Sequence, residues 1–316
     1  MDTFVQQLIN GLTIGAIYAL IALGYTMVYG ILRLINFAHG DIYMVGAYAG
    51  YFLAFQLGYV GTPSLIGLTI VLLGSMLIAA IVGMSIERFA YRPVRKYSRM
   101  TTLITAIGVS LLIENIFVAY RGIGGAPRAF PQLLDNQNYR LFGNAAISTS
   151  QILIFVVSVV LMLLLQFIIY RTKIGTAMRA VSFNLNSAKL MGINTDLIIS
   201  FTFALGSALA AAGGVLTAQY NPQIDPLMGI ITGLKAFVAA VLGGIGNIPG
   251  AVLGGLLIGM AETLVVGYGQ SIGPTLGMDW LVIPSTFRDA VAFSILILVL
   301  LFRPSGLLGS TVQEKV

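Results

Sequence analysis

The chain has 316 residues, of which 58% are hydrophobic and 9% are charged, whereas an average soluble domain has about 25% charged residues. Its formal net charge is +6, it contains no cysteine, and its single histidine is His39. This composition excludes a soluble globular domain, a disulfide framework and thiolate metal sites. It also leaves no set of histidines from which a metal site could be built.

Long stretches without charged residues predict helices that span a lipid bilayer. A spanning helix needs about 20 apolar residues, whereas a spanning barrel strand needs about 10. Charge-free stretches cover residues 3–32, 42–86, 141–170, 197–224 and 236–261, and the second is long enough for two crossings. No basic residue precedes the first stretch, so we predict a retained helix rather than a cleaved signal peptide.

In chain order, the sequence predicts about nine spans, with eight or ten as alternatives. Their bounds are residues 8–30, 42–57, 64–86, 101–120, 151–170, 197–218, 228–242, 251–267 and 289–302. The predicted fold class is all-α: a polytopic transmembrane helical bundle, in which re-entrant or broken helices can occur, forming a single domain over residues 1–316. A re-entrant segment within residues 33–54 would change the count and the side of the N-terminus.

Clusters of basic residues predict the orientation, because short loops rich in Lys and Arg stay in the cytoplasm. Residues 87–99 contain five basic residues and one Glu, and residues 171–196 contain four basic residues. We therefore expect both segments and the C-terminus to be cytoplasmic, and residues 121–150 and 219–226 to lie outside. The excess of positive charge is explained by topology rather than by nucleic-acid binding.

Two interruptions of the apolar pattern are candidates for the translocation path. The first contains Asn36, His39 and Asp41, and the second contains Gly243, Gly244, Gly246 and Asn247. Polar groups and broken helices at membrane depth are tolerated where they line a cavity or are buried in protein, and one break in each half of a chain is typical of a central substrate site. The alternatives are a cytoplasmic helix end, with His39 and Asp41 capping the next helix, and a tight helix hairpin at the glycines.

Residues 175–194 form a segment with helical spacing between two predicted spans. One apolar stripe would consist of Ala177, Ala180, Val181, Ala188 and Met191, with Arg179 and Lys189 elsewhere. Such an amphipathic helix can lie on the lipid surface or dock into a groove of a soluble partner.

The charged residues Glu114, Lys235 and Glu262 fall inside predicted spans rather than at their first or last residue. They could form an ion relay or a buried ion pair, or they could extend to the membrane surface. Glycines four residues apart, as in Gly11/Gly15 and Gly255/Gly259, favour close helix packing.

Chemistry on this chain itself has little support in the sequence. No Gly-Lys dipeptide occurs, so the chain lacks a phosphate-binding loop of the Gly-x-x-x-x-Gly-Lys type. Energy for active transport would therefore come from an ion gradient or from a partner subunit. No cluster of carboxylates, histidines or activated nucleophiles indicates a membrane enzyme.

Several sequence blocks resemble the LivH-type permease of branched-chain amino acid ABC importers. They are the glycine-containing run at residues 11–30, Leu-Ile-Asn-Phe-Ala-His-Gly-Asp at 34–41, Gly-Ala-Tyr at 46–48, Leu-Gly-Gly-Ile-Gly-Asn-Ile-Pro-Gly-Ala at 242–251 and Arg-Pro-Ser-Gly-Leu-Leu at 303–308. The resemblance extends over essentially the whole chain, although the glycine-rich block is shared with sugar permeases.

The resemblance implies a permease subunit for branched-chain or neutral amino acids in the bacterial inner membrane. Its implied partners are a substrate-binding protein, a second, LivM-like permease and two ATPase subunits that carry ATP and Mg, with no cofactor on this chain. It also implies an ATPase-coupling helix in residues 171–196, at Gly175, Arg179, Ala180, Asn184, Ala188, Lys189 and Gly192. The alternatives are a permease for urea or another small amide, and a stand-alone secondary transporter that uses Glu114, Lys235 and Glu262.

Overall fold

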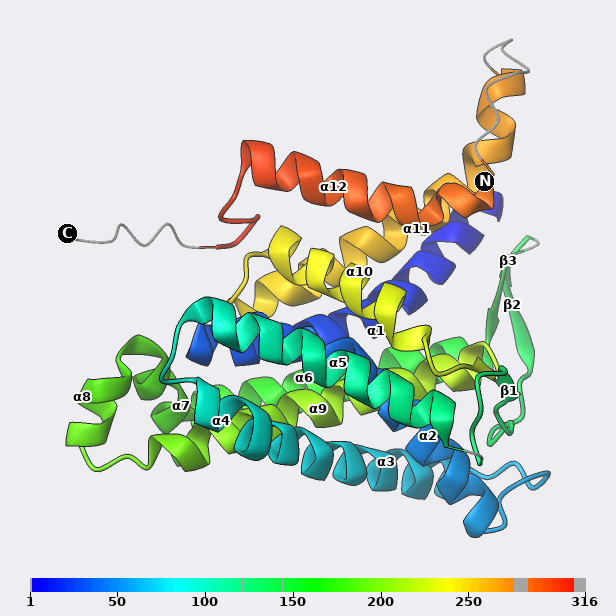
Figure 1. Ribbon diagram of the computed structural model, residues 1–316. Coiled ribbons are helices and arrows are strands. Elements are labelled where there is room, and N and C mark those ends of the chain that lie inside the picture. Colours follow the sequence, from blue (N-terminus) through cyan, green and yellow to red (C-terminus); the bar gives the residue numbers. More distant parts are fainter. Residues whose placement is uncertain (1, 121, 144, 276–283, 310–316) are drawn as a thin grey trace.

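The computed structural model describes residues 2–120, 122–143, 145–275 and 284–309, which form a helical bundle with two small sheets (Figure 1). Its long helices are α1 (Asp2–Leu32), α2 (His39–Gln56), α3 (Leu65–Ile86), α5 (Arg99–Ala119), α6 (Thr149–Arg171), α9 (Thr195–Tyr220), α10 (Met228–Gly243), α11 (Ile248–Thr275) and α12 (Arg288–Phe302). Each overlaps one of the nine spans expected from the sequence, so the predicted all-α polytopic fold class is confirmed.

Six of these helices are long and apolar enough to cross a membrane, namely α1, α3, α5, α6, α9 and α11. The other three are shorter: α2 has 18 residues, α10 has 16 and α12 has 15. A 3₁₀ turn, η2 (Ser285–Phe287), leads into α12. A bilayer crossing needs about 20 residues, so these three helices are shorter than a full crossing.

One end of the bundle carries the strands (right in Figure 1). There β1 (Arg128–Ala129) pairs antiparallel with β4 (Gln223–Ile224), and β2 (Asn138–Phe142) pairs antiparallel with β3 (Ala145–Ser148). Helix α1 begins at this end, where the side-chain oxygen of Gln6 accepts a hydrogen bond of 2.9 Å from the backbone nitrogen of Ala146. The two loops predicted to lie outside are thus neighbours.

The opposite end carries the basic segments (left in Figure 1). Helix α3 continues there into a π-helix, η1 (Glu87–Tyr91), and the short helix α4 (Arg92–Val94). The segment between α6 and α9 forms two helices, α7 (Lys173–Phe183) and α8 (Leu185–Leu190). The segments with opposite predicted membrane sides therefore lie at opposite ends of the bundle.

Helices α1 and α9 form the centre of the bundle. In each, 78% of the most apolar stretch is buried, against 11% in α5 and 22% in α6. The outer helices expose large aliphatic side chains such as Leu111, Leu112 and Leu163. Lipid is the solvent for those faces, since water would not tolerate such a continuous apolar surface.

Glycines allow α1 and α11 to touch along their backbones. A Cβ atom added at Gly15 would lie 2.7 Å from the Cα atom of Leu256, and one added at Gly255 would lie 2.7 Å from the Cα atom of Ala19. Real Cβ atoms do not approach backbone this closely, so only glycine fits. The small-residue pairs seen in the sequence therefore do form the closest helix contact of this part of the core.

Candidate functional site

The connection between α1 and α2 doubles back into the bundle. Helix α1 ends at Leu32, and Arg33 takes a left-handed conformation with φ 52°. Residues 33–38, which we name the re-entrant segment, then lead to His39 at the start of α2. His39 packs against Gly24, where an added Cβ atom would overlap its ring. Since a helix rises about 1.5 Å per residue, α2 begins roughly 12 Å inside the end of α1.

The first turn of α2 is buried rather than exposed at a membrane surface. The Nε2 atom of His39 donates to the backbone oxygen of Ile21 at 3.2 Å, because a carbonyl can only accept. His39 and Asp41 are 1% and 2% exposed, and the N-cap residue Ala38 makes no capping bond with its side chain. The alternative of a surface helix end capped by His39 and Asp41 is therefore not the geometry that the chain adopts.

Aromatic rings surround this turn. The rings of Tyr25 and His39 have centroids 4.6 Å apart in an edge-to-face arrangement, and Tyr25 also meets Phe237 of α10 at 5.9 Å. Phe37 of the re-entrant segment lies 6.4 Å from the same Phe237 ring. Such pairs favour defined relative orientations, so the re-entrant segment is positioned by both α1 and α10.

Asn36 is held by a residue that sequence reasoning did not single out. The hydroxyl of Tyr91, in η1, donates a hydrogen bond of 2.6 Å to the side-chain oxygen of Asn36. Both side chains are buried. Among the described residues Tyr91 is the one side-chain partner of Asn36, whose amide nitrogen is unpartnered there.

Backbone contact joins the start of α2 to α10. A Cβ atom added at Gly40 would lie 2.5 Å from the carbonyl oxygen of Gly229, and one at Gly233 would lie 2.7 Å from the Cα atom of Gly40. A small cavity opens beside this contact, and it is lined by Tyr25, Tyr29, Ile35, Phe237, Ala240 and Ile245. Its volume of about 10 Å³ is close to the space of one water molecule, and its walls are aromatic and aliphatic.

The glycine-rich segment after α10 is a tight hairpin packed on the end of the chain. Gly244 and Gly246 have φ values of 102° and 94°, which favour glycine. Asn247 caps α11 through its side-chain oxygen, 3.1 Å from the nitrogen of Gly250, and its amide donates to the backbone oxygen of Leu308 at 2.6 Å. Gly243 accepts from the nitrogen of Leu308 at 3.0 Å. This geometry is the tight helix hairpin expected from the sequence as one alternative. A role of these residues in the translocation path stays a prediction.

Charged residues within the bundle form a cluster across α10, α11 and α12. Lys235 Nζ lies 3.0 Å from Glu262 Oε1 and 2.6 Å from Asp289 Oδ1, and Arg288 Nε lies 2.9 Å from Glu262 Oε2. The hydroxyl of Tyr18 also donates to Glu262 at 3.0 Å. The buried ion pair expected as one alternative is therefore formed by Lys235 and Glu262. Glu114 is placed apart from them on α5, where it accepts from Ser110 at 3.5 Å.

The segment expected to be one amphipathic helix is two helices, and the prediction that Met191 belongs to its apolar stripe is wrong. Asn184 breaks the helix and caps α8 by accepting a bond of 2.9 Å from the nitrogen of Ser187. Val181 and Ala188 are buried as expected, and Ala177 and Ala180 are partly buried, but Met191 is 81% exposed. Polar N-cap residues compete with helix continuation, which is why the stripe is interrupted.

The predicted coupling residues divide into buried and exposed groups. Gly175 and Ala188 are buried, and Arg179 donates to the backbone oxygen of Ile169 at 2.7 Å. Asn184, Lys189 and Gly192 are exposed. Sequence reasoning missed Phe183 and Leu190 and assigned Met191 to the apolar stripe, whereas these side chains are the most exposed apolar ones of this region, at 89%, 89% and 81%. We call these three the apolar tip.

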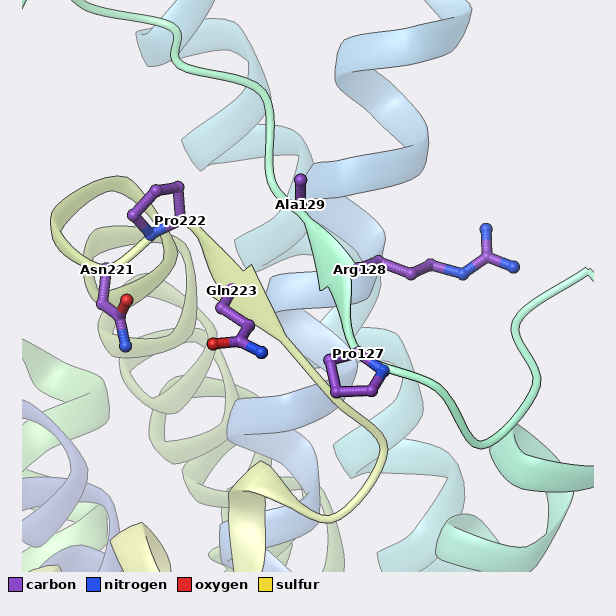
Figure 2. Close-up of a pocket in the computed structure, with 6 residues that line it drawn as sticks. All are labelled: Pro127, Arg128, Ala129, Asn221, Pro222 and Gln223. Atoms are coloured by element: carbon purple, nitrogen blue, oxygen red, sulfur yellow. The ribbon is translucent and has the colours of Figure 1, made fainter.

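The strand end of the bundle has a cavity of its own, with a volume of about 340 Å³. Figure 2 shows that it is lined by Pro127, Arg128, Ala129, Asn221, Pro222 and Gln223, from the paired strands β1 and β4 and their flanks. The Arg128 side chain points away from Asn221 and Gln223. Its Nε atom donates to the backbone oxygen of Ile123 at 3.0 Å, so neutral amides and prolines face this cavity.

Comparison with known proteins gives a consistent result over almost the entire chain. The family described as "Branched-chain amino acid transport system / permease component" matches residues 7–300. The chain is 43% identical to the high-affinity branched-chain amino acid transport system permease protein LivH of Salmonella typhimurium, covering 99% of this chain and 98% of the relative. It is 44% identical to BraD of Pseudomonas aeruginosa with the same coverage, and 31% identical to a probable LivH of Methanocaldococcus jannaschii, covering 92% of this chain and 88% of the relative.

Proposed function

This chain belongs to the family of branched-chain amino acid transport permeases, and on that premise we propose that it forms the translocation path of an ABC importer for branched-chain or neutral amino acids. It is a multi-pass membrane protein whose relatives are transport permeases rather than enzymes. In the proposal, ATP and Mg bind to two partner ATPases, and a second, LivM-like permease completes the path. The assembly would lie in the bacterial inner membrane with the C-terminus in the cytoplasm.

One observation supports ATP-driven transport in particular. The apolar tip, Phe183, Leu190 and Met191, is exposed and belongs to α7, α8 and the turn after α8, which lie at the end of the bundle that carries the basic segments (Figure 1). Exposed apolar side chains grouped among polar ones are typical of protein interaction sites, and a short helix pair can dock into a groove of a soluble partner. The proposed occupant of this surface is the ATPase subunit.

The substrate-binding protein is proposed to dock at the opposite end of the bundle, which carries the strands. The paired strands β1 and β4 and the cavity beside them present prolines, the amides of Asn221 and Gln223, and Arg128 (Figure 2). The substrate would pass from there toward the re-entrant segment, where the cavity beside Phe237 has aliphatic and aromatic walls. The cavity has about 10 Å³ in this structure, so in the proposal it widens during transport, and its apolar walls would then favour an aliphatic side chain over urea.

The stand-alone secondary transporter remains the alternative from another class. It would use Glu114, Lys235 and Glu262 as ion-binding groups. Against it, Lys235 and Glu262 neutralise each other, with Asp289 and Arg288 completing a cluster of zero net formal charge. A cluster balanced in this way supports helix packing rather than ion transport.

Reconstitution tests the proposal. The chain would be purified with the subunits that accompany it and placed in proteoliposomes with ATP inside and binding protein outside. We expect uptake of labelled leucine to require ATP hydrolysis and to exceed uptake of labelled urea. Uptake by the chain alone, driven by a proton or sodium gradient without ATP, would overturn the proposal.

A further inference from the structure

A buried ionic contact ties the beginning of α9, just after the α7–α8 segment, to η1 and α4. Glu87 is 0% exposed, and it accepts from Arg92 Nη2 at 3.5 Å, lies 3.7 Å from Arg95 Nη1 and accepts from the hydroxyl of Ser200. Arg95 also pairs with Asp196. Asp196 and Ser200 belong to the first two turns of α9, and a buried carboxylate is retained only where it is paired. The beginning of α9 is therefore fixed to the end of α3.

The α7–α8 segment reaches this contact over a very short length of chain. Helix α8 ends at Leu190, Gly192 has φ 80°, and Asn194 caps α9 by accepting from the nitrogen of Leu197 at 3.2 Å. Asp196 follows two residues after this cap. Only a few backbone dihedral angles separate the apolar tip from Asp196. A movement of the tip would therefore be passed on to the ion pair rather than absorbed by the connecting chain.

A second contact carries the connection from η1 to the re-entrant segment. Tyr91 packs on Phe203 of α9 with ring centroids 5.5 Å apart, and its hydroxyl donates to Asn36 at 2.6 Å. The backbone oxygen of Asn36 in turn accepts from the nitrogen of His39 at 3.1 Å. Glu87 and Tyr91 are the two ends of one π-helical turn, a rare element that occurs often at functional sites.

We propose that Glu87 and Tyr91 are positioning residues that transmit movement of the α7–α8 segment to the re-entrant segment and the first turn of α2. This inference rests on the proposed function, because it assumes that an ATPase moves the apolar tip. The π-helical turn is the rigid link: its Glu87 end holds α9 and its Tyr91 end holds Asn36. When α9 shifts, the wall of the cavity at Ile35 shifts with it.

Contiguous contacts alone do not establish energetic coupling, so the test measures the number of substrate molecules imported per ATP hydrolysed. The complete transporter would be reconstituted with its ATPases and binding protein, and variants Tyr91→Phe and Glu87→Gln would be compared with wild type. Tyr91→Phe removes only the hydroxyl group that donates a hydrogen bond to Asn36. Tyr97→Phe is the matched control, since Tyr97 lies six residues further on and is 62% exposed.

We expect both variants to hydrolyse ATP at close to the wild-type rate and to import about fivefold less substrate per ATP, in the range that mutations along a coupling route can produce. Tyr97→Phe should match wild type. Should Glu87→Gln assemble poorly, Tyr91→Phe still decides the question. An unchanged ratio of import to hydrolysis in Tyr91→Phe, or an equal loss of both activities, would overturn the inference.

Failure of the proposed function would look different from failure of this inference. In the first case wild type itself would show no ATP-driven import or would not retain ATPases on purification. In the second case wild type would import with ATP, and the Tyr91→Phe variant would do so with the same yield per ATP.

Discussion

Lys235 and Glu262 form an ion pair inside the bundle, with 3.0 Å between Lys235 Nζ and Glu262 Oε1 and with Glu262 fully buried. The pair joins α10 to α11, and Asp289 and Arg288 extend it to the start of α12. Two positive and two negative side chains leave no net formal charge. The charges therefore hold the start of α12, while Phe293, Leu296 and Val299 further along the helix pack against the hydrophobic core.

The balance of this cluster predicts the effect of removing one member. Glu262→Gln leaves Lys235 paired with Asp289 but removes the carboxylate that Arg288 and Tyr18 share, and losing hydrogen bonds to a charged group costs about 1.5–3 kcal/mol. We expect a clear fall in the thermal unfolding temperature of the detergent-purified protein. The double variant Glu262→Gln/Lys235→Met restores zero charge and should be less destabilised than the single variant. An unchanged unfolding temperature in Glu262→Gln, with loss of gradient-driven uptake, would favour the ion-relay alternative.

The contact between α1 and α11 predicts a strong position dependence of glycine substitutions. A Cβ atom at Gly259 would lie 2.5 Å from the Cα atom of Gly15, whereas one at Gly108 of α5 would meet nothing within 4 Å. Overpacking a close contact costs about 1–3 kcal/mol, so Gly259→Ala should lower the unfolding temperature. Gly108→Ala is the matched control and should not lower it. Equal behaviour of the two variants would contradict the backbone contact.

Much of the architecture could be predicted because lipid imposes it. Charge-free stretches of about 20 residues must become helices, since every backbone polar group needs a partner within its own segment. The same rule cannot tell where α2 begins, because that depends on the space that Gly24 leaves for the ring of His39. Nor does it choose between an ion relay and an ion pair for Glu262, because the choice depends on which helices become neighbours.

The α7–α8 segment shows how a local signal was overlooked. Helical spacing suggested one stripe ending at Met191, but Asn184 is a strong N-cap residue and starts a second helix. The break turns Phe183, Leu190 and Met191 outward. The capping preference of Asn was readable from the sequence, whereas the direction of the exposed side chains required the fold.

The capping role of Asn247 makes a prediction about the α10–α11 hairpin. Its side chain caps α11 at Gly250 and donates to the backbone oxygen of Leu308, in the segment after α12. Losing a cap and a further hydrogen bond costs about 2 kcal/mol together, so Asn247→Ala should unfold at a lower temperature. Asn115→Ala is the control, because Asn115 is exposed and donates only to its own helix at Leu111. If the control lost as much stability as Asn247→Ala or more, the hydrogen bonds of Asn247 to Gly250 and Leu308 would not stabilise the hairpin as predicted.

The apolar tip predicts which substitutions separate this chain from an ATPase. Leu190 and Met191 are more than four-fifths exposed, and they make few contacts that could stabilise the chain on its own. Leu190→Asp should therefore leave the unfolding temperature unchanged, because an exposed position tolerates a charge. If the tip fills an apolar groove, a buried unpaired carboxylate costs at least 2 kcal/mol of binding, and ATPase recovery on affinity purification should fall about tenfold or more. Tyr97→Asp, at the same end of the bundle and 62% exposed, is the control that should retain the ATPase. If the Leu190→Asp variant retained the ATPase at the wild-type level, α8 would not be the docking surface. The ATPase would then have to bind other exposed residues at that end of the bundle.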